Sequence, residues 1–278
     1  IRGRDTEFMH DYRVSIRKTR SALTQIDKVF PQGTVTVFNK FFSSLGKLTN
    51  PVRDLDVFQL KLEDYAGDLD KNAIRSLQPL REYLEQSRAH AQKRFVETVK
   101  STEYRHTIKE WREYLEDRKP TTPPLENTNK AVYMLADELI WEMYQLALSE
   151  GNAITDDSEA EALHELRKTC KKLRYLMEFF QSLYPAREIR ELIQALKGLQ
   201  DNLGDYNDLD VHKKILKKYI KQESDPDTGE ACRQIIDILG QRTVKTRNRF
   251  AERFAAFASE ENQAEFKALF VDSRSKQE

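Results

Sequence analysis

The sequence predicts an all-α protein. Only 9 of the 278 residues are glycine and 8 are proline, so few residues interrupt a helix. Apolar residues recur at intervals of three and four through most of the chain, which is the period of a helix with one buried face. The alternating Val35 and Val37 have no partner strand nearby, and we expect a loop that enters a helix there.

Prolines and loops predict where these helices end, because proline lacks the amide that continues a helix. The expected joints are Pro51, Pro185, Pro226 and the segment 120–124, which reads Pro-Thr-Thr-Pro-Pro. We expect a helix over residues 130–149 and a loop over 150–157.

An internal repeat with an offset of 154 residues is the most informative feature. His10, Arg13, Arg17, Lys18 and Arg20 recur without a gap as His164, Arg167, Lys171, Lys172 and Arg174. The stretch 53–57 (Arg-Asp-Leu-Asp-Val) recurs as 207–211 (Asn-Asp-Leu-Asp-Val). A weaker match downstream sets Arg88 opposite Arg242. The repeat predicts one duplicated domain over residues 1–278.

The boundaries follow from the repeat. We expect a first repeat over about 5–118, a linker over 119–129 and a second repeat over about 130–270. The helix expected at 130–149 has no counterpart in the first half of the sequence. The repeat therefore predicts a further helix before residue 1.

Each copy of the repeat carries a basic stripe on one helix face. At about 100° per residue the stripe is roughly 80° wide and borders an apolar face. It contains His10, Arg13, Arg17 and Arg20 in one copy and His164, Arg167, Lys171 and Arg174 in the other. Lys18, Lys168 and Lys172 lie at or beyond its edge. Like charges at this spacing repel one another, so something must compensate them.

Two interpretations of the stripes remain open. Carboxylates of neighbouring helices could neutralise them, and the candidates are Asp54, Asp56, Asp208 and Asp210. Alternatively, a pseudo-twofold axis could bring both stripes into one channel, where these carboxylates would orient the guanidinium groups. Such a channel suits an elongated polyanion such as a phosphate chain, which arginine forks and lysine point charges bind well.

The aspartates themselves have a second interpretation. The pair Asp54 and Asp56, and the pair Asp208 and Asp210, could each hold magnesium or calcium. We favour aspartates that cap helix starts or orient arginines, and we expect neither a metal nor a cofactor.

Residues 10–20, 164–175 and 203–208 resemble the CHAD domain, a helical domain named for its histidines, and the resemblance runs from about residue 5 to 270. It implies two four-helix bundles, related by a pseudo-twofold axis, around a basic central cavity. It also implies binding of inorganic polyphosphate and association with polyphosphate granules; some members are fused to a CYTH triphosphatase domain, which makes such a domain a candidate partner.

The resemblance implies that eight residues line the cavity: His10, Arg13, Arg17, Arg20, His164, Arg167, Lys171 and Arg174. The wider set of expected polyphosphate-binding residues adds Lys18, Arg53, Arg88, Lys168, Lys172 and Arg242. We expect the two stripe histidines to hydrogen-bond phosphate, and we assign no role to His90, His106 or His212.

Other classes are disfavoured. Forty-six basic and forty-six acidic residues give a net charge of zero, which argues against a surface that coats nucleic acid or membrane. No apolar run approaches the roughly 20 residues of a membrane span, so we expect a cytoplasmic protein. Cys170 and Cys232 are expected to be reduced residues in or near the core.

No catalytic motif is found in the sequence, so we expect a binding protein and not an enzyme. Two alternatives stay open. One is a polyphosphatase or triphosphatase, or its accessory domain, and the other is a nucleic-acid or protein interaction module.

Overall fold

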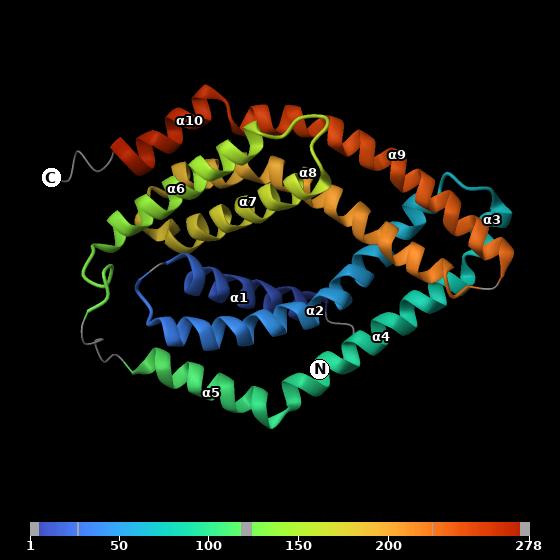
Figure 1. Cartoon of the computed structure of the whole chain (residues 1–278), viewed down its shortest axis with the longest axis horizontal. Helices are drawn as coiled ribbons and strands as arrows, with labels where there is room; N and C mark the ends of the chain where they lie inside the picture. The colour runs from blue at the N-terminus through green and yellow to red at the C-terminus, as the bar shows by residue number, and fades with distance from the viewer. Residues whose placement is uncertain (1–5, 27, 118–123, 224, 273–278) are drawn as a thin grey trace. The chain divides into compact units, whose positions relative to one another are not determined.

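The computed structural model describes residues 6–26, 28–117, 124–223 and 225–272, and these residues form helices joined by turns and short loops, with no strand. The helices, shown in chain order in Figure 1, are α1 (Thr6–Gln25), α2 (Gln32–Ala66), α3 (Lys71–Ser76), α4 (Gln78–Lys100), α5 (Thr102–Glu116), α6 (Val132–Asn152), α7 (Ala160–Phe180), α8 (Ala186–Ile220), α9 (Pro226–Phe257) and α10 (Glu260–Lys267). Short helical turns follow α7 at Gln181–Leu183 and α10 at Ala268–Asp272. The all-α prediction is confirmed.

Several predicted boundaries are confirmed. Pro185 lies directly before α8, and Pro226 begins α9. The helix expected at 130–149 is α6, although it extends through Asn152 and so shortens the loop expected at 150–157. Residues 119–123 of the expected linker, and the expected helix before residue 1, lie outside the described residues.

The expected joint at Pro51 is wrong, because Pro51 lies inside the 35-residue helix α2. Proline costs this helix one backbone hydrogen bond. The helix continues because apolar residues on both sides of the proline are buried, including Leu45, Val52 and Phe58. Val35 and Val37 also belong to α2, so the loop expected there is absent.

The expected cap positions of the aspartates are wrong as well. Asp54 and Asp56 lie in the interior of α2, and Asp208 and Asp210 lie in the interior of α8. The Asp-Leu-Asp pattern can cap a helix only where a helix begins. In both copies apolar residues continue at helical spacing before and after the pattern, so the helix does not begin there.

The chain forms two compact units. Of the described residues, the first unit contains 6–14, 43–117 and 206–246, and the second unit contains 15–42, 124–205 and 247–272. Each unit is therefore built from three separate stretches of sequence. Helices α1, α2, α8 and α9 each contribute residues to both units.

The core of the first unit comes from one face of each of four helices. Leucines and aromatic residues at helical spacing on α2 and α4 pack with residues of α8 and α9. The fully or nearly fully buried members include Phe58, Leu62, Leu80, Leu84, Leu216, Cys232, Ile235 and Leu239. A smaller cluster joins Met9 of α1 to Val52, Ala91 and Phe95.

The core of the second unit is dominated by aromatic residues around α6, which packs along α7. The ring of Tyr144 stacks on that of Phe266 with centroids 3.7 Å apart. Gly151 of α6 lies against the ring of Phe254, and a Cβ at this position would overlap that ring. The buried Asp137 accepts a hydrogen bond of 2.8 Å from the hydroxyl of Tyr184.

Candidate functional site

Helices α1 and α7 present most of the predicted stripe residues within the second unit. On α7 the apolar residues Leu166, Cys170 and Leu173 are fully buried, and this fixes the angle of the neighbouring basic face. The half-buried cations are Arg17, Lys18 and Arg20 of α1 and Arg167, Lys171 and Arg174 of α7, with His164 beside them. Lys168 and Lys172 are exposed, as expected for residues at the edge of the stripe.

Side-chain contacts between five residues join the two helices. The guanidinium of Arg17 lies 5.8 Å from the centroid of the Tyr175 ring, close enough for a cation–π contact. Lys18 Nζ lies 3.6 Å from Glu178 Oε2, and Arg174 Nε donates to Glu178 Oε1 at 2.6 Å. Glu178 thus holds one cation from each helix. We call Arg17, Lys18, Arg167, Lys171, Arg174, Tyr175 and Glu178 the α1–α7 cluster.

The Nε atom of Arg17 is buried and has no hydrogen-bond partner among the described residues. A buried polar group without a partner is costly, and it calls for an explanation. An anion bound at the guanidinium would supply the missing acceptor.

The surroundings of Tyr175 are positive. Burial raises the pKa of the Tyr175 phenol, while the charges of Arg17, Arg174 and Arg167 act in the opposite direction. The charge of Glu178 adds to the effect of burial. The phenol therefore stays neutral near pH 7 and adds no negative charge to the cluster.

Amide side chains fix two of the arginines. Arg20 Nε donates to Asn39 Oδ1 at 3.3 Å, and Arg174 Nη1 donates to Gln200 Oε1 at 3.4 Å. Gln200 is itself anchored by its Nε2, which donates to the carbonyl of Cys170 at 2.6 Å. The amide of Asn39 positions the Arg20 guanidinium without neutralising it, whereas Arg174 is paired with Glu178 as well.

The sequence analysis missed four of these residues: Asn39, Tyr175 as a ring contact, Glu178 and Gln200. Glu178 could have been found, because it lies four residues after Arg174 and so one helical turn away. Asn39 and Gln200 come from other helices, and no local pattern marks them.

Two stripe residues of α1 belong to the first unit. Arg13 donates to Thr49 Oγ1 at 2.6 Å and to Asn50 Oδ1 at 3.0 Å, both on α2. His10 is exposed.

The predicted residues Arg53, Arg88 and Arg242 also lie in the first unit, where each pairs with carboxylates. Arg53 binds Asp208 with both Nη atoms, at 2.7 and 3.0 Å, and contacts Asp54 at 3.1 Å. Arg88 Nε donates to Asp56 at 2.6 Å. Asp54, Asp56 and Asp208 thus each contact an arginine, and their orienting role stays a prediction. Asp210 instead pairs with Lys214 one turn away, at 2.7 Å.

Arg242 has partners that the sequence analysis did not name. It pairs with Asp64 and lies 3.8 Å from Asp68, and its guanidinium covers the ring of Tyr65 at 5.0 Å. A phosphate role for these three arginines would require the ion pairs to open.

The pair of Arg53 and Asp208 is the more buried of these contacts. Burial alone would raise the pKa of the Asp208 carboxyl, but the hydrogen bonds and charge of Arg53 hold it below its usual value. Asp208 is therefore ionised at neutral pH.

Other features of the described residues bear on function. In the described ranges, no group of three or more His, Cys, Asp or Glu side chains is placed to hold a metal ion. No helix in that part of the chain is long and apolar enough to cross a membrane. Cys170 and Cys232 are buried and unbridged, as predicted, and burial raises the pKa of each thiol to about 12.

The helices and the α1–α7 cluster define an all-α protein with a half-buried cationic surface. The chain belongs to the CHAD domain family, whose family model matches residues 1–217. The family resemblance read from the sequence is thereby confirmed.

Two solved structures share the fold. The crystal structure of the CHAD domain from the plant Ricinus communis aligns with a TM-score of 0.76 and 23% identity, over 92% of this chain and 82% of that one. PptA from Streptomyces chartreusis aligns with a TM-score of 0.72 and 13% identity, over 89% of each chain. No curated protein matches the chain.

Proposed function

We propose that the chain binds inorganic polyphosphate, or a similar linear polyanion, through the α1–α7 cluster. The observation that carries this proposal is the half-buried guanidinium of Arg17, which lies over Tyr175 with its Nε donor unused. Membership of the CHAD family supports it, because the family resemblance implies polyphosphate as the ligand.

The chemistry of the cluster suits a phosphate chain. Phosphate oxygens accept from guanidinium forks in pairs, and lysine adds a mobile charge. Glu178 orients Lys18 and Arg174 at the same time. One carboxylate among several cations leaves the cluster positive, which a polyanion requires.

We also propose that binding occurs without hydrolysis, in the cytoplasm, with polyphosphate granules as the place of action. A partner or fused triphosphatase domain would then supply any chemistry on the phosphate chain.

The first prediction replaces two cluster cations, as Arg17→Gln with Lys171→Gln. We expect the affinity for long-chain polyphosphate to fall by about tenfold or more, since a hydrogen bond to a charged group contributes about 1.5–3 kcal/mol and 1.4 kcal/mol is tenfold. Isothermal titration calorimetry measures the change. The matched control is Arg253→Gln with Lys267→Gln, two exposed cations of the same unit, which should bind as the unmodified protein does.

Four outcomes would count against this proposal. Equal affinity of both double variants for polyphosphate would show that the α1–α7 cluster is not the binding site. Displacement of polyphosphate by single-stranded or duplex nucleic acid at equal phosphate concentration would show a general polyanion binder. Release of phosphate in the presence of magnesium would show an enzyme. An affinity that does not fall with added salt would argue against ionic attraction.

A further inference from the structure

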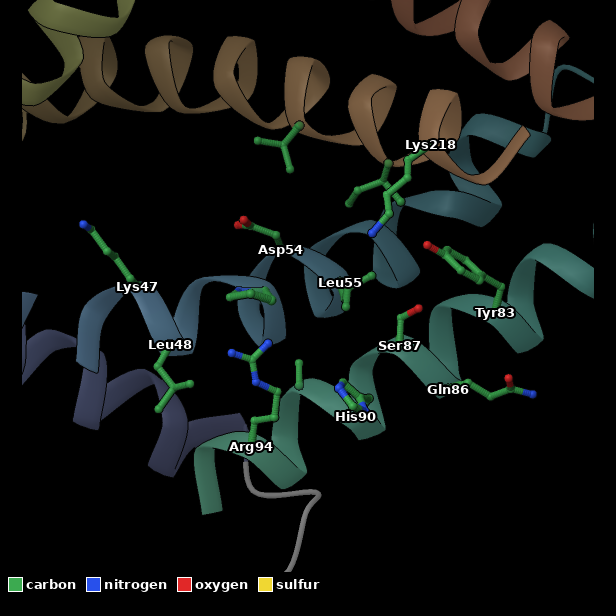
Figure 2. A pocket seen from close by; sticks show the side chains of 14 residues that line it. Lys47, Leu48, Asp54, Leu55, Tyr83, Gln86, Ser87, His90, Arg94 and Lys218 are labelled. Carbon is green, nitrogen blue, oxygen red and sulfur yellow. The ribbon is translucent and has the colours of Figure 1, made fainter. Parts of the chain in front are cut away.

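The first unit contains a cavity that the proposed polyphosphate site does not use. Its volume is about 740 Å³, within the range of small-molecule pockets. It is formed by α2, α4 and α8, and Figure 2 shows its lining side chains. We call it the α2–α4–α8 pocket.

The walls of this pocket are mainly apolar. Leu55 and Ala91 are buried and face it, and half-buried aliphatic residues extend the same surface from α2 and α8. These aliphatic residues are Leu48, Val211 and Ile215. An apolar ligand surface of matching size would gain free energy by leaving water here.

The rim of the pocket is cationic. Lys47, Arg94 and Lys218 are exposed residues that line it, and among the described residues none of the three forms an ion pair. In Figure 2, Arg94 extends from α4 toward α2, and Lys218 extends from α8 toward the same space. The one carboxylate in the lining, Asp54, is already paired with Arg53. The pocket therefore has a positive rim above an apolar floor.

Two of these cations do not belong to the repeated basic pattern. At the offset of 154 residues, Asp201 stands opposite Lys47, and Asp64 stands opposite Lys218. His90, to which the sequence analysis gave no role, lines the same pocket. Lys47 and Lys218 therefore occur once in the sequence, whereas the basic stripe occurs in both copies of the repeat.

We infer that the α2–α4–α8 pocket binds an organic anion, with an apolar body on the aliphatic floor and an anionic head between Arg94 and Lys218. Polyphosphate has no apolar body, so its chemistry leaves the floor of this pocket unused. The inference goes beyond the proposed function and does not rest on it.

Two sources could supply such an anion, a fatty-acid carboxylate and a nucleotide phosphate. The second prediction is that dodecanoate or ATP binds at least about tenfold more tightly than tripolyphosphate, which carries charge without an apolar body. Titration of the full chain with each of the three compounds measures this difference. The arm that binds identifies the source.

Three variants locate the binding. Arg94→Gln with Lys218→Gln should weaken the amphiphilic ligand by about tenfold, whereas Lys93→Gln with Lys217→Gln should leave it unchanged. The control residues are the exposed neighbours of the test residues on the same helices and do not line the pocket. Ser87→Phe keeps the charge and fills the cavity, and should also weaken binding.

The inference is overturned if neither amphiphilic probe binds, if tripolyphosphate binds as tightly as they do, or if the Arg94 and Lys218 variant binds normally. Displacement of the bound probe by excess long-chain polyphosphate would overturn it too, because the pocket would then be part of a polyphosphate site. A protein that binds dodecanoate or ATP but not polyphosphate would support the pocket while rejecting the proposed function.

Discussion

His212 is a buried histidine whose environment keeps it neutral. Its ring is fully buried, stacks on Phe58 at 4.6 Å, and places Nδ1 3.0 Å from the hydroxyl of Tyr65. Burial lowers the pKa of His212 to about 4; Asp208 opposes this shift, and the charges of Lys61 and Arg53 add to it. The folded protein therefore resists protonation of a group that titrates near pH 6.5 when unfolded.

The third prediction follows from this difference in pKa. Between about pH 4 and 6.5 the unfolded chain binds more protons than the folded one, so the free energy of unfolding falls as the pH falls. His212 should contribute a loss of about 2 kcal/mol between pH 7.5 and pH 5. Asp208 stays ionised in this window, because its pKa lies below its usual value.

Urea unfolding at the two pH values measures this loss. The control is His212→Phe, whose stability should depend less on pH by about the same amount. If the two proteins lose equal stability on acidification, the neutral state assigned to His212 is wrong.

At the scale of single residues, the sequence predicted the types of group better than their partners. The stripe positions on α1 and α7 follow from helical spacing, and five of the six stripe members in the second unit are half-buried cations. The partners Glu178, Asn39 and Gln200 depend on how helices pack, and spacing within one helix does not contain that information.

At the scale of the helix, glycine positions in α6 and α8 have opposite roles. Gly151 lets the ring of Phe254 approach the backbone of α6, whereas nothing lies within 4 Å of a Cβ built on Gly198 of α8. One glycine is required by packing, and the other only weakens its helix.

The fourth prediction compares alanine at these two positions. Gly151→Ala should lower the free energy of unfolding by about 1–3 kcal/mol, because the added methyl group overlaps a buried ring. Gly198→Ala should raise it by about 0.5–1 kcal/mol, through higher helix propensity and a less flexible unfolded chain. Chemical denaturation of both variants measures the changes, and a Gly151→Ala protein as stable as the unmodified one would contradict the close contact.

Helix ends were predicted where nothing buried overrides the local signal. Pro185 and Pro226 lie at helix ends, whereas Pro51 lies inside α2 between buried residues. The same burial carries α2 through Asp54 and α8 through Asp208. A proline or an aspartate therefore does not end a helix when apolar residues at helical spacing are buried on both sides of it.

At the scale of the whole molecule, each unit depends on stretches that are distant in sequence. Phe58, Leu62 and Leu84 of the first half pack with Leu216 and Ile235 of the second half in a single core. The class of fold could be predicted from composition and period. The division of the chain into units could not, because residues about 150 positions apart complete the core of the first unit. Whether the two sequence repeats are structural copies stays a prediction.

The fifth prediction concerns a fragment that contains only the first part of the chain. Residues 1–118 expressed alone should not unfold cooperatively, because the fragment lacks the residues of α8 and α9 that cover α2 and α4. Circular dichroism during urea titration measures this. Co-expression with residues 119–278 is the control and should restore a cooperative transition. A sharp transition in the isolated fragment would show that its core is complete without them.

The two cysteines offer a practical consequence. Both native thiols are buried with raised pKa values, so few thiolates are present to react with an alkylating dye near neutral pH. A single cysteine introduced at the exposed Lys172 would then carry nearly all of the label. A fluorophore at that edge of the α1–α7 cluster would test the proposed binding of a phosphate chain directly, in a protein whose native thiols need not be removed.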